Sequence, residues 1–360
     1  MTRLRIITFI SFFLSSWIFF SGAPLTTEEK GSPLPSQWLQ NENPIYTTQQ
    51  HIRGTDQTFL TYPEWFLVHS PKEQADYFAR HTSTSFPYLG HIQQLWKSYA
   101  IVTKQIAADF EVNIGYHVMI LVIAVSTTVE YAIKAFYEKF IGEVTNPSTN
   151  YLTEEDRFNA VVTREYVDFI LQTPWYEFDF FSRLVTLWTD IPYTGNYMWR
   201  KIERRYYLSL DLAIKSIYGY IIKLATKSAY EEPLLNTSVI VEDYQELANA
   251  KIKSLGELES DKVALSLPRY DGFNGAINDL VKNDIKIKEI AGNNSVLLLT
   301  LLVPQKWNIQ HEYAKTIFSQ TILTNPSVKR VGVCVRVKGL NSVLRLLQEK
   351  GIQIEHVYDY

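Results

Sequence analysis

Two apolar segments without charged residues dominate the hydrophobic pattern of the chain. The first runs from Ile6 to Ala23 and follows Arg3 and Arg5. Basic residues before an apolar segment keep the N-terminus inside the cell and direct the following chain outward. The small residues at the end of the segment fit both a cleavage site and a retained helix. Residues 1–23 are therefore predicted to be a signal peptide or an N-terminal membrane anchor, with the chain after them exported.

The second apolar segment covers residues 112–133. It carries no charge between Glu111 and Glu130, a length close to the roughly 20 residues that a helix needs to cross hydrocarbon. We expect a transmembrane helix here, and a buried helix of a soluble domain is the alternative. If the segment spans the membrane, the rest of the chain returns to the cytoplasm, whereas otherwise it stays outside.

The exported portion before this segment divides into two parts. Residues 24–58 are rich in Pro, Thr, Gln and Asn without periodicity, which predicts an extended linker. Residues 59–110 are predicted to form a small helical extracytoplasmic part. A helix start is expected at Ser70, because Pro and Glu follow at the first and third helical positions. Apolar residues at helical spacing predict a further helix over 88–102.

Residues 140–235 are predicted to be a helical, aromatic-rich region at the membrane surface. A capping signature at 153–156 opens one helix. The segment 174–188 mixes aromatic and charged residues, and it is followed by the basic run 200–205 and an apolar stripe over 210–224. A basic amphipathic helix of this kind suits an anionic membrane leaflet. A buried aromatic core and a solvated helix packed on its neighbours are the alternatives.

From residue 250 to residue 360, short strands alternate with helices, which predicts a separate α+β domain. Strands are expected near 263–267, 285–287, 295–303 and 330–338 and before Tyr358, with helices near 271–280 and 310–320 and before the last strand.

Part of this domain occurs twice. GFNGAINDLVKNDIKIKEI at 272–290 aligns without gaps on GLNSVLRLLQEKGIQIEHV at 339–357, each after a strand. The identical pairs are Gly272/Gly339, Asn274/Asn341, Leu280/Leu347, Ile285/Ile352 and Ile287/Ile354. Two βαβ units of one design predict a ferredoxin-like fold, in which helices cover one antiparallel sheet.

The second unit, VRVKGLNSVLRLLQEKGIQIEHVYDY at 335–360, resembles the ACT domain family. It has that family's strand, Gly-Leu helix start and Gly-Ile-x-Ile-Glu-x-x-Tyr strand. The resemblance implies a ferredoxin-like fold, pairing through sheet or helix contacts, and a regulatory role. Val337 and Lys338 stand where the family usually has an acidic residue and a proline, so the family's ligand binding is not carried over.

Composition narrows the classes of function. With a net charge of −3, the chain has no overall attraction to nucleic acid, and no nucleic-acid partner is expected. Aromatic residues make up 14% of the chain, which suits a boundary between lipid and water. Cys334 is the single cysteine, which excludes an intrachain disulfide and every multi-cysteine metal site.

Histidines provide the candidate chemistry. Five of the seven lie in the exported portion or at the start of the second apolar segment, namely His51, His69, His81, His91 and His117. None has the spacing of a helical metal site, so neither a metal nor a cofactor is expected. His117 is the leading candidate, because an ionisable group within a membrane helix needs a polar partner; Asn113, Thr128 and Tyr131 share its helix face. His91 and Glu64 are further candidates.

These features predict an integral inner-membrane protein bound to the lipid bilayer. A cytoplasmic ferredoxin-like domain is expected to serve regulation, sensing or assembly and to form a possible homo-oligomer contact, rather than to carry an enzyme activity. One alternative is a membrane-bound enzyme or redox protein with a histidine and carboxylate site at the outer face. A second alternative is an exported binding protein.

Overall fold

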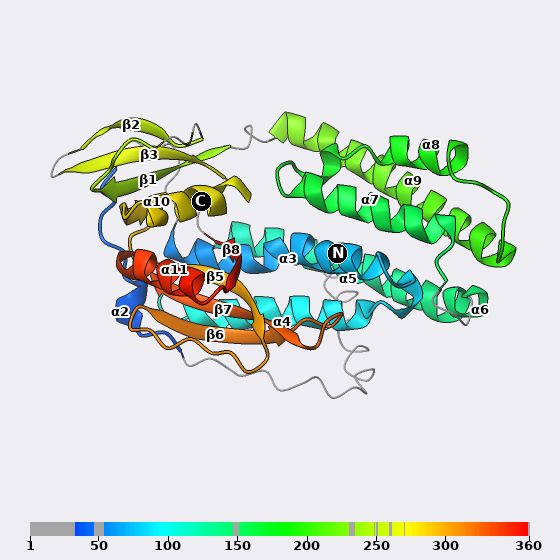
Figure 1. Ribbon diagram of the computed structural model, residues 1–360, viewed down its shortest axis with the longest axis horizontal. Helices are drawn as coiled ribbons and strands as arrows, with labels where there is room; N and C mark the ends of the chain where they lie inside the picture. Colours follow the sequence, from blue (N-terminus) through cyan, green and yellow to red (C-terminus); the bar gives the residue numbers. More distant parts are fainter. Residues whose placement is uncertain are drawn as a thin grey trace, which may run out of the picture.

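The computed structural model describes residues 33–46, 54–146, 151–229, 235–247, 249, 251–258, 261–269 and 271–358. The predicted signal or anchor at 1–23 and His51 lie outside these residues. The elements of 154–229 lie at one end of the long axis and those of 236–290 at the other, and the helices of 55–137 run along this axis beside the second sheet of 296–357 (Figure 1).

The first two-thirds of the described chain is helical, as predicted. Its helices are α2 (Ser36–Leu39), α3 (Thr55–Phe78), α4 (Tyr88–Ile106), α5 (Ile114–Tyr137), α6 (Glu143–Thr145), α7 (Glu154–Ile170), α8 (Phe180–Thr189) and α9 (Met198–Ala229). Short turns connect them at η2 (Ser83–Ser85), the π-helical η3 (Glu138–Gly142) and η4 (Trp175–Glu177). The start of α7 is confirmed, because Thr153 and Asp156 form a capping box.

The last third is the predicted α+β part, and it begins earlier than residue 250. Its first half contains β1 (Asn236–Glu242), β2 (Lys253–Glu257), β3 (Lys262–Pro268), α10 (Asp271–Lys282) and β4 (Lys286–Ile290). Its second half contains β5 (Val296–Pro304), β6 (Ala314–Thr321), β7 (Val328–Arg336), η5 (Val337–Gly339), α11 (Leu340–Glu349) and β8 (Gln353–Val357). A helix was expected near 310–320, but most of these residues belong to β6, whose pairing with β7 outweighs local helical spacing.

The two halves have the same topology. Each forms a four-stranded antiparallel sheet, in the orders β2-β3-β1-β4 and β6-β7-β5-β8. The internal repeat is therefore confirmed, but the prediction of one sheet carrying both units is wrong. Each βαβ crossover lies in its own sheet. Strand β1 lies between the parallel strands β3 and β4, and β5 lies between the parallel strands β7 and β8.

The structure explains why glycine and asparagine stand at the repeated positions. A Cβ at Gly339 would lie 2.1 Å from the Tyr313 ring, and one at Gly272 would lie 2.9 Å from Pro268, so neither position has room for a side chain. The Asn341 amide closes the free edge of β4: its Oδ1 accepts from the Ile287 amide at 3.1 Å, and its Nδ2 donates to the Ile285 carbonyl at 2.6 Å. The second unit is thereby joined to the first.

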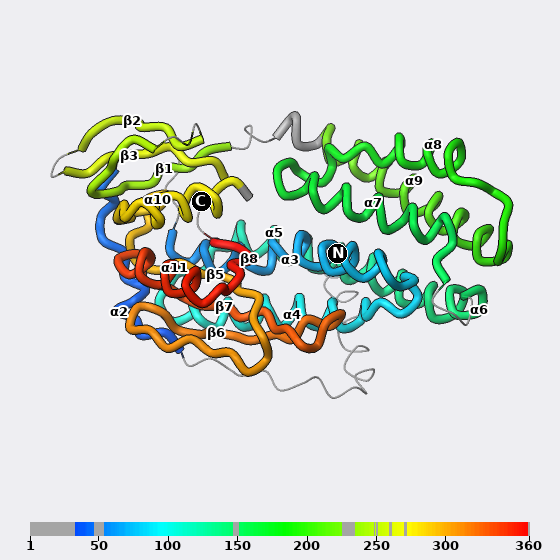
Figure 2. The backbone as a smooth tube through the Cα atoms, viewed as in Figure 1, coloured from blue at the N-terminus to red at the C-terminus, as the bar shows by residue number. Residues whose placement is uncertain are grey.

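Helices α3 and α4 cover the second sheet. Helix α3 packs against β5 and α4 against β6, and Figure 2 shows these blue and cyan helices beside the orange and red strands. The predicted helix start at Ser70 is wrong, because α3 runs through both Pro63 and Pro71. Burial of most of its residues, among them Phe59, Leu60 and Phe66, stabilises the helix despite the hydrogen bonds that proline removes.

This packing also corrects the predicted division of the chain. Residues 33–46, expected to belong to an extended linker, include α2, and the Asn41 amide donates to Gly292 at 3.0 Å. The buried Phe59 and Leu60 share one core with Leu298. A membrane cannot separate residues that share a core, so residues 59–110 and the α+β domain lie on one side of any membrane; which side that is stays a prediction.

The helical part has an unusual surface. Within the described residues, Ile114–Thr145 is the one stretch long and apolar enough to cross a bilayer. Its side chains Val122, Ile133 and Phe136 are 61, 64 and 66% exposed. Helix α9 also turns its predicted apolar stripe outward, with Ile217 63% exposed.

Asn341→Ala tests the junction between the two α+β units. The substitution leaves a strand edge without its two hydrogen bonds, so we expect the free energy of unfolding to fall by about 1–3 kcal/mol. Urea denaturation measures the change. The control Glu349→Ala removes an exposed side chain of the same helix and should change stability by less than about 0.5 kcal/mol. Equal effects of the two substitutions would contradict the role of Asn341.

Candidate functional site: a buried polar chain beside a cavity

Helix α3 supplies one side of the site. Tyr62, Phe66, His69 and Glu73 recur at spacings of four, three and four residues, so they share one helix face. All four are buried against the second sheet or against α4 and α5. Polar residues on a buried helix face need partners, and the strands β7 and β8 supply most of them.

Arg330 of β7 is the centre of the buried chain and is 1% exposed. Its Nε and Nη2 donate to Glu355 of β8 at 2.6 and 2.8 Å, and Nη2 also donates to Glu73 at 3.0 Å. Burial by itself would raise the pKa of Glu355, but the Arg330 charge outweighs it and lowers that pKa to about 2. At Glu73 burial dominates and raises the pKa to about 7.

A β-bulge places β8 for these contacts. The pairing of β5 with β8 shifts register between Thr300 and Leu301, so consecutive residues of β8 are not held strictly to opposite faces. Glu355 thereby contacts His69, and His356 stacks on Trp65 with ring centroids 3.5 Å apart. Both contacts are made to α3.

His69 continues the chain as a neutral imidazole. Its Nδ1 lies 3.5 Å from the Glu355 carboxylate, and its Nε2 lies 2.6 Å from the Tyr358 hydroxyl, which in turn contacts Thr300 at 3.1 Å. Burial lowers the pKa of His69 to about 3, against the attraction of Glu355.

A second branch leads from Glu73 into the helical part. His91 Nε2 lies 3.6 Å from Glu73, its Nδ1 lies 2.9 Å from Ser70 Oγ, and that oxygen lies 2.7 Å from the Tyr131 hydroxyl. Burial lowers the pKa of His91 to about 3. Ser70, His91 and Glu73 are arranged like the nucleophile, the base and the orienting carboxylate of a catalytic triad. However, they are only 1, 0 and 7% exposed, so this branch is sealed from solvent.

Tyr131 connects this branch to a cavity. The cavity has a volume of about 110 Å³ and lies among α3, α5, α7, α8 and α9. Four charged residues form a closed ring on its wall. Lys134 lies 2.8 Å from Glu130 and 3.7 Å from Asp211, while Lys215 lies 2.9 Å from Asp211 and 3.4 Å from Glu130. The net charge of this charged ring is zero.

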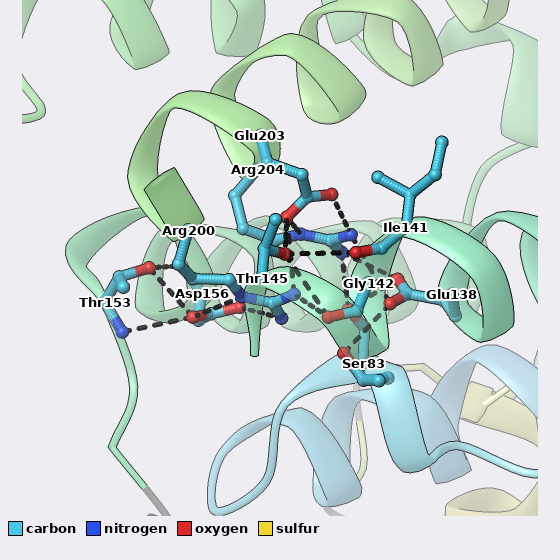
Figure 3. A network of polar contacts seen from close by, with 11 residues as sticks. Ser83, Glu138, Ile141, Gly142, Thr145, Thr153, Asp156, Arg200, Glu203 and Arg204 are labelled. Atoms are coloured by element: carbon cyan, nitrogen blue, oxygen red, sulfur yellow. Dashed lines mark hydrogen bonds and ion pairs between the residues drawn. The ribbon is translucent and has the colours of Figure 1, made fainter. Parts of the chain in front are cut away.

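A separate ionic cluster fixes the start of α9 (Figure 3). Arg204 donates to Glu138 at 2.6 Å and to Ser83 at 2.8 Å, and Arg200 donates to Asp156 at 2.9 Å. Lys201 and Arg205 both pair with Glu155, at 3.0 and 2.7 Å.

The four cations of this cluster, Arg200, Lys201, Arg204 and Arg205, are at most 4% exposed. The basic run was predicted to face an anionic leaflet, and that prediction is wrong because its charges are already paired inside the protein.

The three candidates from the sequence lie in different places. His91 belongs to the buried chain. His117 Nδ1 contacts the Tyr99 hydroxyl at 2.8 Å, and Glu64 accepts from the Tyr116 hydroxyl at 2.8 Å. They do not form the single site of the enzyme alternative. Among the described residues, no three His, Cys, Asp or Glu side chains are placed to hold a metal ion.

The central residues of the chain were missed in the sequence. Glu73 was assigned only to a helix cap, and Arg330 and Glu355 only to strands. Charged residues within otherwise apolar strands could have indicated this network. A charge that is buried in a strand requires a partner of opposite charge.

Comparisons with known proteins give no match: no family model, curated protein or solved structure matches the chain.

Arg330→Met tests the centre of the chain. It leaves Glu73 and Glu355 buried without their cation, so we expect the free energy of unfolding to fall by about 3–5 kcal/mol. In the control Arg345→Met, an exposed pair with Asp284 is lost, and the expected cost is below about 1 kcal/mol. Denaturant titration of both variants measures the difference, and similar losses would refute the central role of Arg330.

Acid should destabilise the fold through His69 and His91. Their pKa values are lowered to about 3 in the folded protein, so their contribution is complete above the unfolded value near 6.5 and is lost as pH falls towards 3. Glu73, with a raised pKa, opposes this loss, because its contribution is present at low pH and is lost as pH rises through 7.

His91→Gln should therefore reduce the slope of unfolding free energy between about pH 6 and 4 by about 1.4 kcal/mol per pH unit. Thermal and urea unfolding across this range measure the slope. The exposed His81→Gln is the control. A slope unchanged by His91→Gln would show that this imidazole is not held neutral.

Proposed function

We propose that the chain is a non-enzymatic membrane-bound protein, with α5 and α9 in contact with lipid and the α+β part serving regulation or sensing. The supporting observation is that both helices bury charged side chains, such as Lys134 of α5, and expose large apolar ones. In α9, Arg200 and Arg204 are fully buried while Ile214 and Ile217 are 64 and 63% exposed. Water favours the opposite arrangement, whereas hydrocarbon favours apolar side chains outside and paired charges inside.

The aromatic residues of this part agree with an interfacial position. Trp188, Trp199 and Tyr206 are 57, 81 and 61% exposed on α8 and α9. Exposed Trp and Tyr side chains are typical of the boundary between headgroups and acyl chains. The alternative of a buried aromatic core accounts for Phe178 and Phe180, which pack in the interior.

The proposal places the α+β part outside the cytoplasm, on the side to which the predicted N-terminal signal directs the chain. Its support is the contact of Arg330 with Glu73 across 257 residues of sequence. If α3 is exported, the strands that share its buried charges are exported with it. The protein then combines the predicted membrane attachment with the location of the exported binding protein.

A regulatory or sensing role is supported by the rigid connection between the two parts. Hydrogen bonds and short polar contacts lead from Tyr131, on the cavity wall, through Ser70 and His91 to Glu73 and Arg330. A change at the cavity therefore has a direct physical route to β7 and β8.

Lipid contact can be measured by labelling. Cys334 is buried, so an introduced cysteine reacts selectively with a polarity-sensitive dye. In the full chain in liposomes, dye at Ile217→Cys or Val122→Cys should emit at shorter wavelength and be quenched by nitroxide lipids. The control Leu255→Cys, 51% exposed on β2, should report water. Equal water exposure at all three positions would overturn the proposed lipid contact.

Compartment can be measured with a membrane-impermeant maleimide on bacterial spheroplasts. Leu89→Cys on α4 and Gln348→Cys on α11 are both exposed, and both should be labelled before lysis. Labelling of only one would contradict the shared side, and protection of both would contradict an extracytoplasmic location. A cysteine in a cytoplasmic protein of the host is the control for intact spheroplasts.

A further inference from the structure

The cavity beside Tyr131 is too polar to be an empty packing defect. Its volume of about 110 Å³ exceeds the roughly 30 Å³ share of one water and approaches that of a cavity that binds benzene when its walls are apolar. Here the wall carries the charged ring of Glu130, Lys134, Asp211 and Lys215. Such a cavity is occupied by water or by a polar ligand.

The charged ring lies between the outside and the interior. The side chain of Glu130 is 41% exposed and that of Lys215 is 27% exposed, whereas Asp211 is 22% and Lys134 11% exposed. Glu130 and Lys215 therefore lie at the accessible edge between α5 and α9, and Lys134 lies at the inner wall.

Three tyrosines on the inner wall lack partners for their hydroxyl groups. Tyr88, Tyr166 and Tyr207 line the cavity, and no contact within the part of the chain that the structure describes satisfies their hydroxyls. Tyr88 is only 3% exposed. None of these hydroxyls is among the sealed polar atoms without a partner, so they border the space of the cavity, where water or a ligand can form hydrogen bonds with them.

We propose that this cavity binds a small zwitterion, a molecule with one ammonium group and one anionic oxygen group. The carboxylates of Glu130 and Asp211 receive the ammonium group, and the Lys134 and Lys215 ammonium groups receive the anion. Each lysine has three N–H donors and two carboxylate neighbours. Because the ring is neutral, a ligand of net charge would leave a buried charge uncompensated, and the volume restricts the ligand to a few non-hydrogen atoms.

Calorimetric titration of the full chain in lipid nanodiscs tests this proposal. The probes are glycine and β-alanine, with acetate and methylammonium as ligands that carry one charge each. We expect saturable binding of at least one zwitterion and at least tenfold weaker binding of both single-charge probes. Failure of both zwitterions to bind to folded protein, or equally tight binding of acetate, would overturn the proposal.

Variants assign the binding to the cavity. Asp211→Asn and Lys215→Met should each weaken binding at least tenfold, since each removes one charge of the ring. Thr127→Leu fills the cavity and leaves all four charges, so it should also abolish binding; circular dichroism checks that each variant folds. The matched control is Arg157→Met, which breaks an exposed pair on α7. Unchanged affinity in the three cavity variants would refute the site.

The same chemistry occurs in free solutes and in zwitterionic lipid headgroups. β-Alanine binding in both phosphatidylglycerol and phosphatidylethanolamine nanodiscs assigns the cavity to a free solute. Binding in phosphatidylglycerol that is lost in phosphatidylethanolamine shows that the headgroup competes for it. The zwitterion site and the lipid contact of α5 and α9 are tested separately. Titration of the soluble probes against the protein in detergent measures binding at the cavity even if the labelling experiment shows no lipid contact.

Discussion

The position of Arg330 between Glu73 and Glu355 is the constraint on which the rest of the structure depends. A guanidinium that is 1% exposed is tolerated only with carboxylates at hydrogen-bond distance, and a helix and two strands must meet to provide them. That requirement fixes α3 against the second sheet, places His69 and Tyr358 in contact, and aligns Glu73 with His91. Buried ionic contacts consequently join the helical and α+β parts.

The helical part also pairs its buried charges with one another, but it exposes apolar side chains on its surface. Charges are paired inside, in the charged ring at the cavity and in the cluster of Figure 3, while apolar side chains of α5 and α9, such as Val122 and Ile217, face outward. In water this arrangement forgoes the burial of apolar area that stabilises a soluble fold. Contact with acyl chains removes that cost and strengthens the internal ion pairs, because water no longer competes for them. The membrane proposal thus rests on where the charges lie.

Local patterns predicted much of the fold. The repeat found by aligning 272–290 on 339–357 reappears as two units of identical topology, and its two glycines lie where neighbouring side chains leave no room for a Cβ. Helix α7 was found from its capping residues. The strands β1 and β2 were missed, because β2 is an exposed edge strand without the alternation that marks a half-buried one.

The candidate site was only partly predictable. His91 was singled out as a histidine, but its partners were not, and His117 and Glu64 belong to separate contacts. By itself, the sequence determined the elements, the internal repeat and the apolar stripes of α5 and α9, because these follow from spacings of a few residues. Only the tertiary structure decided which face is buried and which carboxylates meet Arg330. Glu73 lies 257 residues away from it along the chain, and no local spacing encodes a contact at that separation.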